Sequence, residues 1–141
     1  MPVMTAMEIS QFLAREFPQS TPERTEIVEL TDGFTKVRRA MEAADLRPGG
    51  TVSGPAMMAL ADTTMYIVLL AMIGPVALAV TTNLTINFLR KPGLGDMLAE
   101  ARLLKLGRRL AVGEVTLFSG DRSEPVAHCT LTYSIPPRRG S

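Results

Sequence analysis

Residues 53–75 read SGPAMMALADTTMYIVLLAMIGP, and this stretch decides the fold of the chain. Ser53 or Gly54 is suited to cap a helix, Pro55 fits its first position, and Gly74-Pro75 would end it. The predicted helix is apolar nearly all round, so it has no polar face to turn toward solvent. It must therefore be wrapped by other structure.

Strands follow this helix. Residues 79–89 alternate in the manner of a half-buried antiparallel strand. The predicted faces are Val80, Thr82, Leu84, Ile86 and Phe88 on one side, and Thr81, Asn83, Thr85 and Asn87 on the other. Three more strands are predicted at residues 97–106, 110–119 and 126–135, with turns at 107–109 and 120–123.

Before the central helix, residues 5–8 form a capping box that opens an amphipathic helix. Residues 23–43 alternate around an Asp-Gly pair at 32–33, which predicts a hairpin, and the Pro- and Gly-rich residues 46–50 predict a loop. The order of elements favours an α+β fold, with an antiparallel sheet wrapped around the long apolar helix.

The chain has 141 residues and 46% hydrophobic content, enough for one compact domain over residues 1–141 but not for two. Its formal net charge of +1 gives no general attraction to nucleic acid or acidic membranes. A single cysteine and an N-terminus without a signal pattern favour the cytoplasm. The apolar run 65–80 is shorter than the roughly 20 residues of a membrane span and is interrupted by Gly74-Pro75, so no membrane partner is expected.

Asp62 is the one charged side chain between Pro48 and Leu89. Its helical neighbours at three and four residues are Met58, Ala59, Met65 and Tyr66. A carboxylate among such neighbours must be paired, hydrogen-bonded or used in chemistry. Both a catalytic role and a structural role, bonded to Thr or Tyr hydroxyls, stay open at this point.

The Gly-rich residues 49–54 run into the start of the helix, where free amides can polarise a carbonyl oxygen. A plain helix cap is the simpler alternative. Gly54 and Asp62 are eight residues apart, about 12 Å along a helix, so one carbonyl cannot touch both within one chain. If both act on one thioester, Asp62 comes from a neighbouring subunit across a two-fold interface.

The segment Gly50-Thr51-Val52-Ser53-Gly54, Asp62 and the strand 81–90 resemble the hotdog-fold acyl-CoA thioesterases of the phenylacetate-degradation type. The similarity covers most of residues 40–135. The resemblance implies a hotdog fold and a CoA thioester bound between subunits of a homodimer or dimer of dimers. It implies that the Gly54 amide polarises the thioester carbonyl, that Asp62 is nucleophile or general base, and that Thr81 helps to place water or the carboxylate. Coenzyme A would be part of the substrate, and no cofactor or metal is expected.

Three positions depart from the family pattern. Ser53 replaces the usual His, and Pro55 replaces a second Gly. Arg47 occupies the position where many members have a polar Asn or Gln that faces the thioester. Arg47, Ser53 and Asn83 are expected to contact the substrate. A non-catalytic acyl-CoA or apolar-ligand binding protein remains an alternative, and a hotdog dehydratase ranks lower because it would resemble the family better with a His on or beside the central helix.

Basic residues gather at turns, and the resemblance implies that the first two clusters bind the phosphates of CoA. The clusters are Arg90-Lys91, Arg108-Arg109 and Arg138-Arg139. His128 and Cys129 are adjacent on a predicted strand, so their side chains point to opposite faces and cannot form a dyad. Cys129 is expected in the core.

Overall fold

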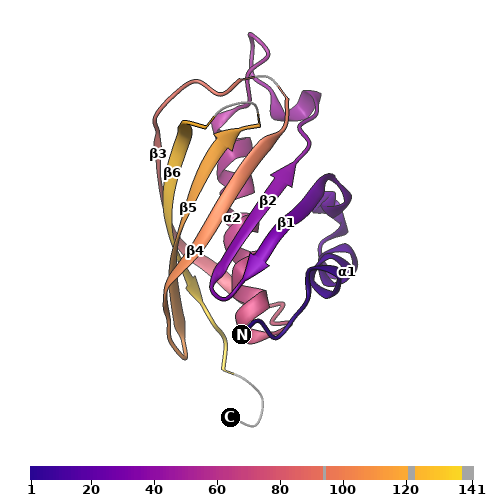
Figure 1. Ribbon diagram of the computed structural model, residues 1–141, viewed down its shortest axis with the longest axis vertical. Helices are drawn as coiled ribbons and strands as arrows, with labels where there is room; N and C mark the ends of the chain where they lie inside the picture. The colour runs from indigo at the N-terminus through magenta and orange to yellow at the C-terminus, as the bar shows by residue number, and fades with distance from the viewer. Residues whose placement is uncertain (94, 121–122, 138–141) are drawn as a thin grey trace.

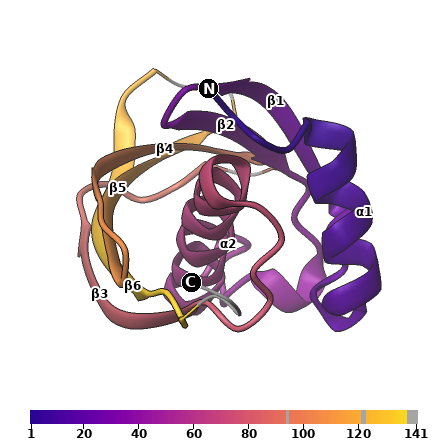
Figure 2. The ribbon, with the colours of Figure 1, turned by 90° about the horizontal axis from the view of Figure 1, so that it is seen from below.

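The computed structural model describes residues 1–93, 95–120 and 123–137, and contains one six-stranded antiparallel sheet wrapped around a long helix (Figures 1 and 2). In chain order the elements are α1 (Ala6–Glu16), η1 (Pro18–Ser20), η2 (Pro22–Arg24), β1 (Thr25–Thr31), β2 (Phe34–Arg39), η3 (Ala43–Asp45), α2 (Gly54–Ile73), β3 (Val80–Phe88), β4 (Met97–Leu106), β5 (Leu110–Ser119) and β6 (Pro125–Ser134). The sheet order is β1-β2-β4-β5-β6-β3. The predicted α+β hotdog fold is confirmed.

Helix α1 and the β1–β2 hairpin form where their capping and turn residues predict them. Thr5 and Glu8 complete the predicted capping box of α1. The β1–β2 hairpin turns on Asp32-Gly33, and Gly33 has φ +70°, which suits a residue without a Cβ. The short 3₁₀ helices η1 to η3 were not predicted, because single turns leave no periodic pattern in a sequence.

Helix α2 begins after Ser53, whose side chain accepts a hydrogen bond from the Ala56 amide, and its C-cap is Gly74 at φ 95°. By length and hydropathy it would qualify as a membrane span, and 61% of that window is buried inside the fold. The sheet and α1 surround its C-terminal half almost completely (Figure 2). The expectation that its whole circumference is buried is wrong for its N-terminal half, where an apolar stripe of Pro55, Met58 and Ala59 is exposed.

The side of strand β3 predicted for Thr81 is wrong. The β3–β6 register shifts between Thr81 and Asn83, and a bulge of this kind rotates the side chains on one side of it relative to those on the other. Thr81 therefore faces α2, on the same side as Leu84 and Ile86, and not outward with Asn83 as strict alternation predicted.

The concave face of the sheet packs closely on α2. Gly113 of β5 lies against Met65, and a Cβ at this position would stand 2.5 Å from the Met65 sulfur. Cys129 points into this core, and burial raises the pKa of its thiol to about 12. His128 lies on the convex face and contacts Glu114, so the exclusion of a His-Cys dyad is confirmed.

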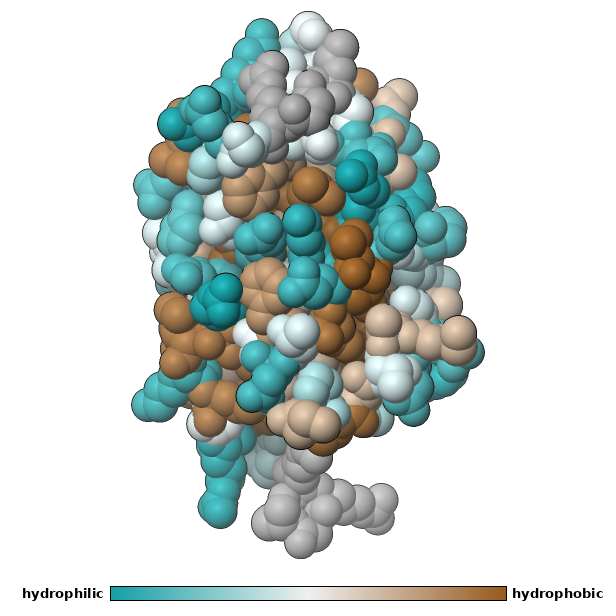
Figure 3. Space-filling view, viewed as in Figure 1, coloured by the Kyte–Doolittle hydropathy of each residue, from teal (hydrophilic) through white to brown (hydrophobic). Residues whose placement is uncertain are grey.

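The convex face carries hydrophilic residues with apolar side chains scattered among them (Figure 3). Strands β1 and β3 form the two edges of the sheet. Helix α1 lies beside the β1 end, whereas the outer edge of β3 pairs with no other strand in the described part of the chain (Figure 2). The predicted turn at 107–109 is confirmed, while residues 121–122 of the other predicted turn lie outside the described residues.

Candidate active site

Asp62 is held by two hydroxyl groups from distant strands. Thr81 of β3 donates to Oδ1 at 2.5 Å, and Tyr133 of β6 donates to the same oxygen at 2.7 Å. Oδ2 accepts no hydrogen bond from the described residues. The carboxylate is thus fixed through one oxygen while the other is open to a ligand, an arrangement suited to a nucleophile or a general base.

Tyr133 is the functional candidate that the sequence did not reveal. It is 3% exposed, and its hydroxyl also lies 3.0 Å from the Asp62 carbonyl oxygen. Burial and the Asp62 charge raise the pKa of Tyr133 well above its usual range, so it stays a donor at neutral pH. No local pattern marks it, because Tyr is common in buried strands.

A cavity of about 370 Å³ opens beside Asp62, between the end of α1 and the start of β3. Its walls are Leu13, Phe17, Ser20, Asp62, Thr63, Tyr66, Ala79, Val80, Thr81 and Tyr133. Phe17 meets the Tyr66 ring edge-on at 5.6 Å, and Tyr66 stacks on Tyr133 at 6.0 Å. The walls are therefore mainly aromatic and aliphatic around a single carboxylate.

The N-terminus of α2 presents one available amide. Pro55 has no N–H, and the amides of Ala56 and Met57 donate to the Ser53 side chain and carbonyl. The Gly54 N–H has no acceptor among the described residues. A free amide at a helix N-terminus can stabilise a developing oxyanion.

A groove of about 720 Å³ borders Gly54. Arg47, Arg90 and Lys91 contribute its charged walls, and Phe88 and Met57 contribute apolar ones. The Phe88 ring lies 3.3 Å from where a Gly54 Cβ would stand, so a larger residue at this position would push the ring by a few tenths of an ångström. Arg90 pairs with Glu124 at 2.8 Å, whereas Arg47 and Lys91 form no ion pair with a described residue. The groove suits an anionic ligand.

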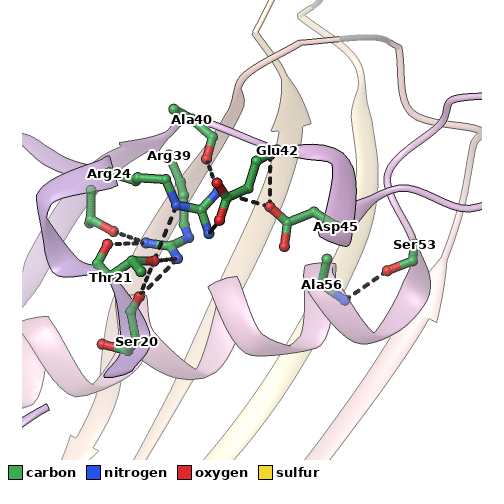
Figure 4. A network of polar contacts seen from close by, with 10 residues as sticks. Ser20, Thr21, Arg24, Arg39, Ala40, Glu42, Asp45, Ser53 and Ala56 are labelled. Atoms are coloured by element: carbon green, nitrogen blue, oxygen red, sulfur yellow. Dashed lines mark hydrogen bonds and ion pairs between the residues drawn. The ribbon is translucent and has the colours of Figure 1, made fainter. Parts of the chain in front are cut away.

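A polar network fixes the loop that leads to Gly54 (Figure 4). Arg24 bonds Asp45 at 3.0 Å and pairs with Glu42 at 3.1 Å, while Arg39 donates to the carbonyls of residues 20 and 21. The Asp45 carbonyl accepts the Ser53 N–H at 2.8 Å. Burial tends to raise the pKa of Asp45, but bonds from the Glu42 amide and Arg24 outweigh it, and the net pKa is lowered.

Comparisons with known proteins agree with this geometry. The family model described as thioesterase superfamily matches residues 49–126, which span both Gly54 and Asp62. The chain belongs to this superfamily. No curated protein is significantly similar in sequence.

Several solved structures are similar to this thioesterase-superfamily chain in both sequence and fold. A candidate thioesterase of Silicibacter sp. is 49% identical, with 97% of this chain and 95% of that chain covered and a TM-score of 0.89. The phenylacetic acid degradation protein of Thermus thermophilus, in a mutant form, is 27% identical over 84% and 99%, with a TM-score of 0.71. A Streptococcus mutans protein bound to acetyl-CoA is 26% identical over 82% and 90%, with a TM-score of 0.70.

Within this thioesterase-superfamily chain, the predicted site residues divide into groups. Asp62 and Thr81 line the smaller cavity, while Gly54, Arg47, Arg90 and Lys91 line the groove. The two cavities share no lining residue. Gly54 and Asp62 therefore open onto different cavities of one chain.

Other predicted residues lie elsewhere. Ser53 caps α2 next to the groove, and Asn83 is exposed on the convex side of β3, away from both cavities. Arg108 and Arg109 line a cavity at the opposite end of α2, with Met72 and Ile73. The structure therefore does not bring them to the Gly54 groove within one chain. Arg138 and Arg139 lie outside the described residues.

Proposed function

We propose that this chain hydrolyses acyl-CoA thioesters at an interface between two copies of itself. The observation that carries the proposal is the Gly54 N–H, the one available amide at the α2 N-terminus, which opens onto a groove with three basic side chains. In this proposal the groove holds the CoA phosphates, and the Gly54 amide binds the thioester oxygen.

The carboxylate in this proposal comes from the partner. Asp62 continues the exposed stripe of Pro55, Met58 and Ala59 along one face of α2. An apolar stripe of this kind is unusual on a free surface, and an antiparallel pair of α2 helices would cover it. Such pairing would bring Asp62 of each subunit toward the partner's Gly54. The unpaired edge of β3 offers a second surface for a copy of the chain.

The chemistry proposed is transfer of the acyl group to water. The C–S bond of the thioester breaks, a C–O bond forms, and the thiol of CoA leaves with one proton. As general base, Asp62 takes a proton from water and returns it to the sulfur. As nucleophile, it forms an anhydride that water then hydrolyses. In both routes Oδ2, which accepts no hydrogen bond from a described residue, is the reacting oxygen, while Oδ1 stays bonded to Thr81 and Tyr133.

The dehydratase alternative loses support from the position of the one histidine in the chain. His128 lies on the convex face of the sheet with Glu114 and lines neither cavity. A binding protein that holds acyl-CoA without turnover differs from the proposal only in rate.

Release of free thiol from a panel of acyl-CoAs tests the proposal. We expect turnover with at least one acyl-CoA and loss of it in Asp62→Asn. Tight binding of every panel member without thiol release would contradict hydrolysis and support the binding protein.

A further inference from the structure

We infer that the cavity beside Asp62 is the acyl-group site and that it selects uncharged, apolar acyl chains against those that carry a terminal carboxylate. This inference rests on the proposed function and names its substrate class. It concerns the 370 Å³ space between α1 and β3 and not the larger basic groove.

The position of the cavity follows from the two ends of a thioester. The carbonyl carbon joins the CoA half of the substrate to the acyl half. If the CoA half lies in the basic groove next to one subunit's Gly54, the acyl half continues past the attacking carboxylate. In the proposed dimer this carboxylate is Asp62 of the other copy, so the acyl half would enter that copy's cavity. The cavity is walled by Leu13, Phe17 and Tyr66.

Four of the five hydroxyl groups that line the cavity are already engaged as donors. Ser20 donates to the Phe17 carbonyl at 2.7 Å, and Tyr66 donates to the Val76 carbonyl at 3.1 Å. Thr81 and Tyr133 both donate to Asp62. These four hydroxyls have no proton left for a polar acyl group, whereas the fifth, that of Thr63, donates to no described residue. A carboxylate placed here would lose part of its hydration and gain at most the Thr63 donor, which is costly.

The charge of Asp62 also disfavours an acyl group that carries a carboxylate. Asp62 is the one carboxylate among the lining residues, and no Arg, Lys or His lines the cavity. A second carboxylate would meet the charge of Asp62 with no cation to offset it. An apolar chain instead gains from contact with the aromatic walls, by roughly fourfold in affinity per buried methylene.

Two inert thioethers test the selectivity without any turnover. S-hexyl-CoA and S-(5-carboxypentyl)-CoA have the same chain length and differ in a terminal carboxylate. By calorimetry with the wild-type protein, S-hexyl-CoA should bind at least tenfold more tightly than both CoA and the carboxylated analogue. Equal affinities for the two thioethers would overturn the acyl-site inference.

Turnover of the acyl-CoA panel decides the proposed function separately. Hydrolysis of hexanoyl-CoA and adipoyl-CoA at equal kcat/KM would leave hydrolysis standing and refute the selectivity. Preferential binding of S-hexyl-CoA without hydrolysis of any panel member would support the site and refute the enzyme.

A matched pair of variants locates the site. Ser20→Lys adds a cation at the exposed rim of the cavity, and Gln19→Lys adds the same charge at an exposed neighbour outside the lining. Ser20→Lys should narrow the preference for S-hexyl-CoA over its carboxylated analogue at least threefold, and Gln19→Lys should leave it unchanged. The same change in both variants, or in neither, would place the acyl group elsewhere.

Discussion

The Tyr133 hydroxyl lies 2.7 Å from Oδ1 of Asp62 and 3.0 Å from the carbonyl oxygen of the same residue. One buried donor therefore fixes both the side chain and the backbone at the residue proposed to act on the thioester. Together with Thr81 it restricts rotation of the carboxylate and leaves Oδ2 as the reactive oxygen.

Asp62→Asn should abolish most turnover while the protein stays folded. An asparagine Oδ1 can still accept the bonds of Thr81 and Tyr133, so the free energy of unfolding should change little or rise. Loss of the base or nucleophile should lower kcat by roughly 10²- to 10⁴-fold. Thiol release and urea unfolding measure the two effects. Wild-type turnover in a folded variant would refute the assignment.

Thr81→Val removes one of the two bonds to the carboxylate without changing the size of the side chain. We expect kcat to fall about tenfold with little change in KM, since a lost bond to a charged group is worth on the order of 1.5–3 kcal/mol. Thr85→Val, on the convex side of the same strand, is the matched control and should keep wild-type kcat. Tyr133→Phe should resemble Thr81→Val. If KM alone changed, the hydroxyls would bind substrate and not orient Asp62.

The basic groove should bind the CoA phosphates, with Lys91 contributing more than Arg90, because Arg90 is already paired with Glu124. Replacing Arg47 and Lys91 by Gln should weaken CoA affinity roughly three- to thirtyfold, and the loss should shrink at high salt. Titration calorimetry at two salt concentrations measures this. An equal loss from Arg108→Gln with Arg109→Gln would indicate that phosphates lie at the opposite end of α2.

Ala59→Arg should disrupt the proposed dimer, because it puts a long charged side chain on the exposed stripe of α2. Light scattering should give about twice the chain mass for the wild type and the chain mass for the variant, with loss of turnover. Met7→Arg, an equally drastic change at a residue that is 70% exposed on α1, should remain dimeric. A monomeric wild type at micromolar concentration would refute the shared site.

Asp45→Asn should destabilise the protein in a pH-dependent way. The folded-state pKa of Asp45 lies below its ordinary value, so its ion pair stabilises the fold above about pH 4 and loses this effect as the pH falls through the lowered pKa. At pH 7 we expect a loss of about 1–3 kcal/mol in the free energy of unfolding. The difference from wild type should vanish at acid pH. A constant difference from pH 7 to pH 3 would exclude the carboxylate as its source.

Local patterns were enough to predict most elements of this chain. Both α-helices were predicted because their caps lie within a few residues of the amides they satisfy, as for Ser53 and Ala56. The strands followed from alternation, and β4 and β5 have the predicted bounds. Asp62 stood out because an isolated charge in an apolar helix is costly, a property that is visible without coordinates.

Tertiary structure alone decided how the site is assembled. Tyr133 reaches Asp62 across 71 positions, and Thr81 turns toward it only because a bulge interrupts the β3–β6 register. Arg108-Arg109 and Arg90-Lys91 look equivalent in the sequence but lie at opposite ends of α2. Sequence periodicity records which face a residue takes within its own element, whereas register and sheet curvature depend on the packing of all six strands around α2.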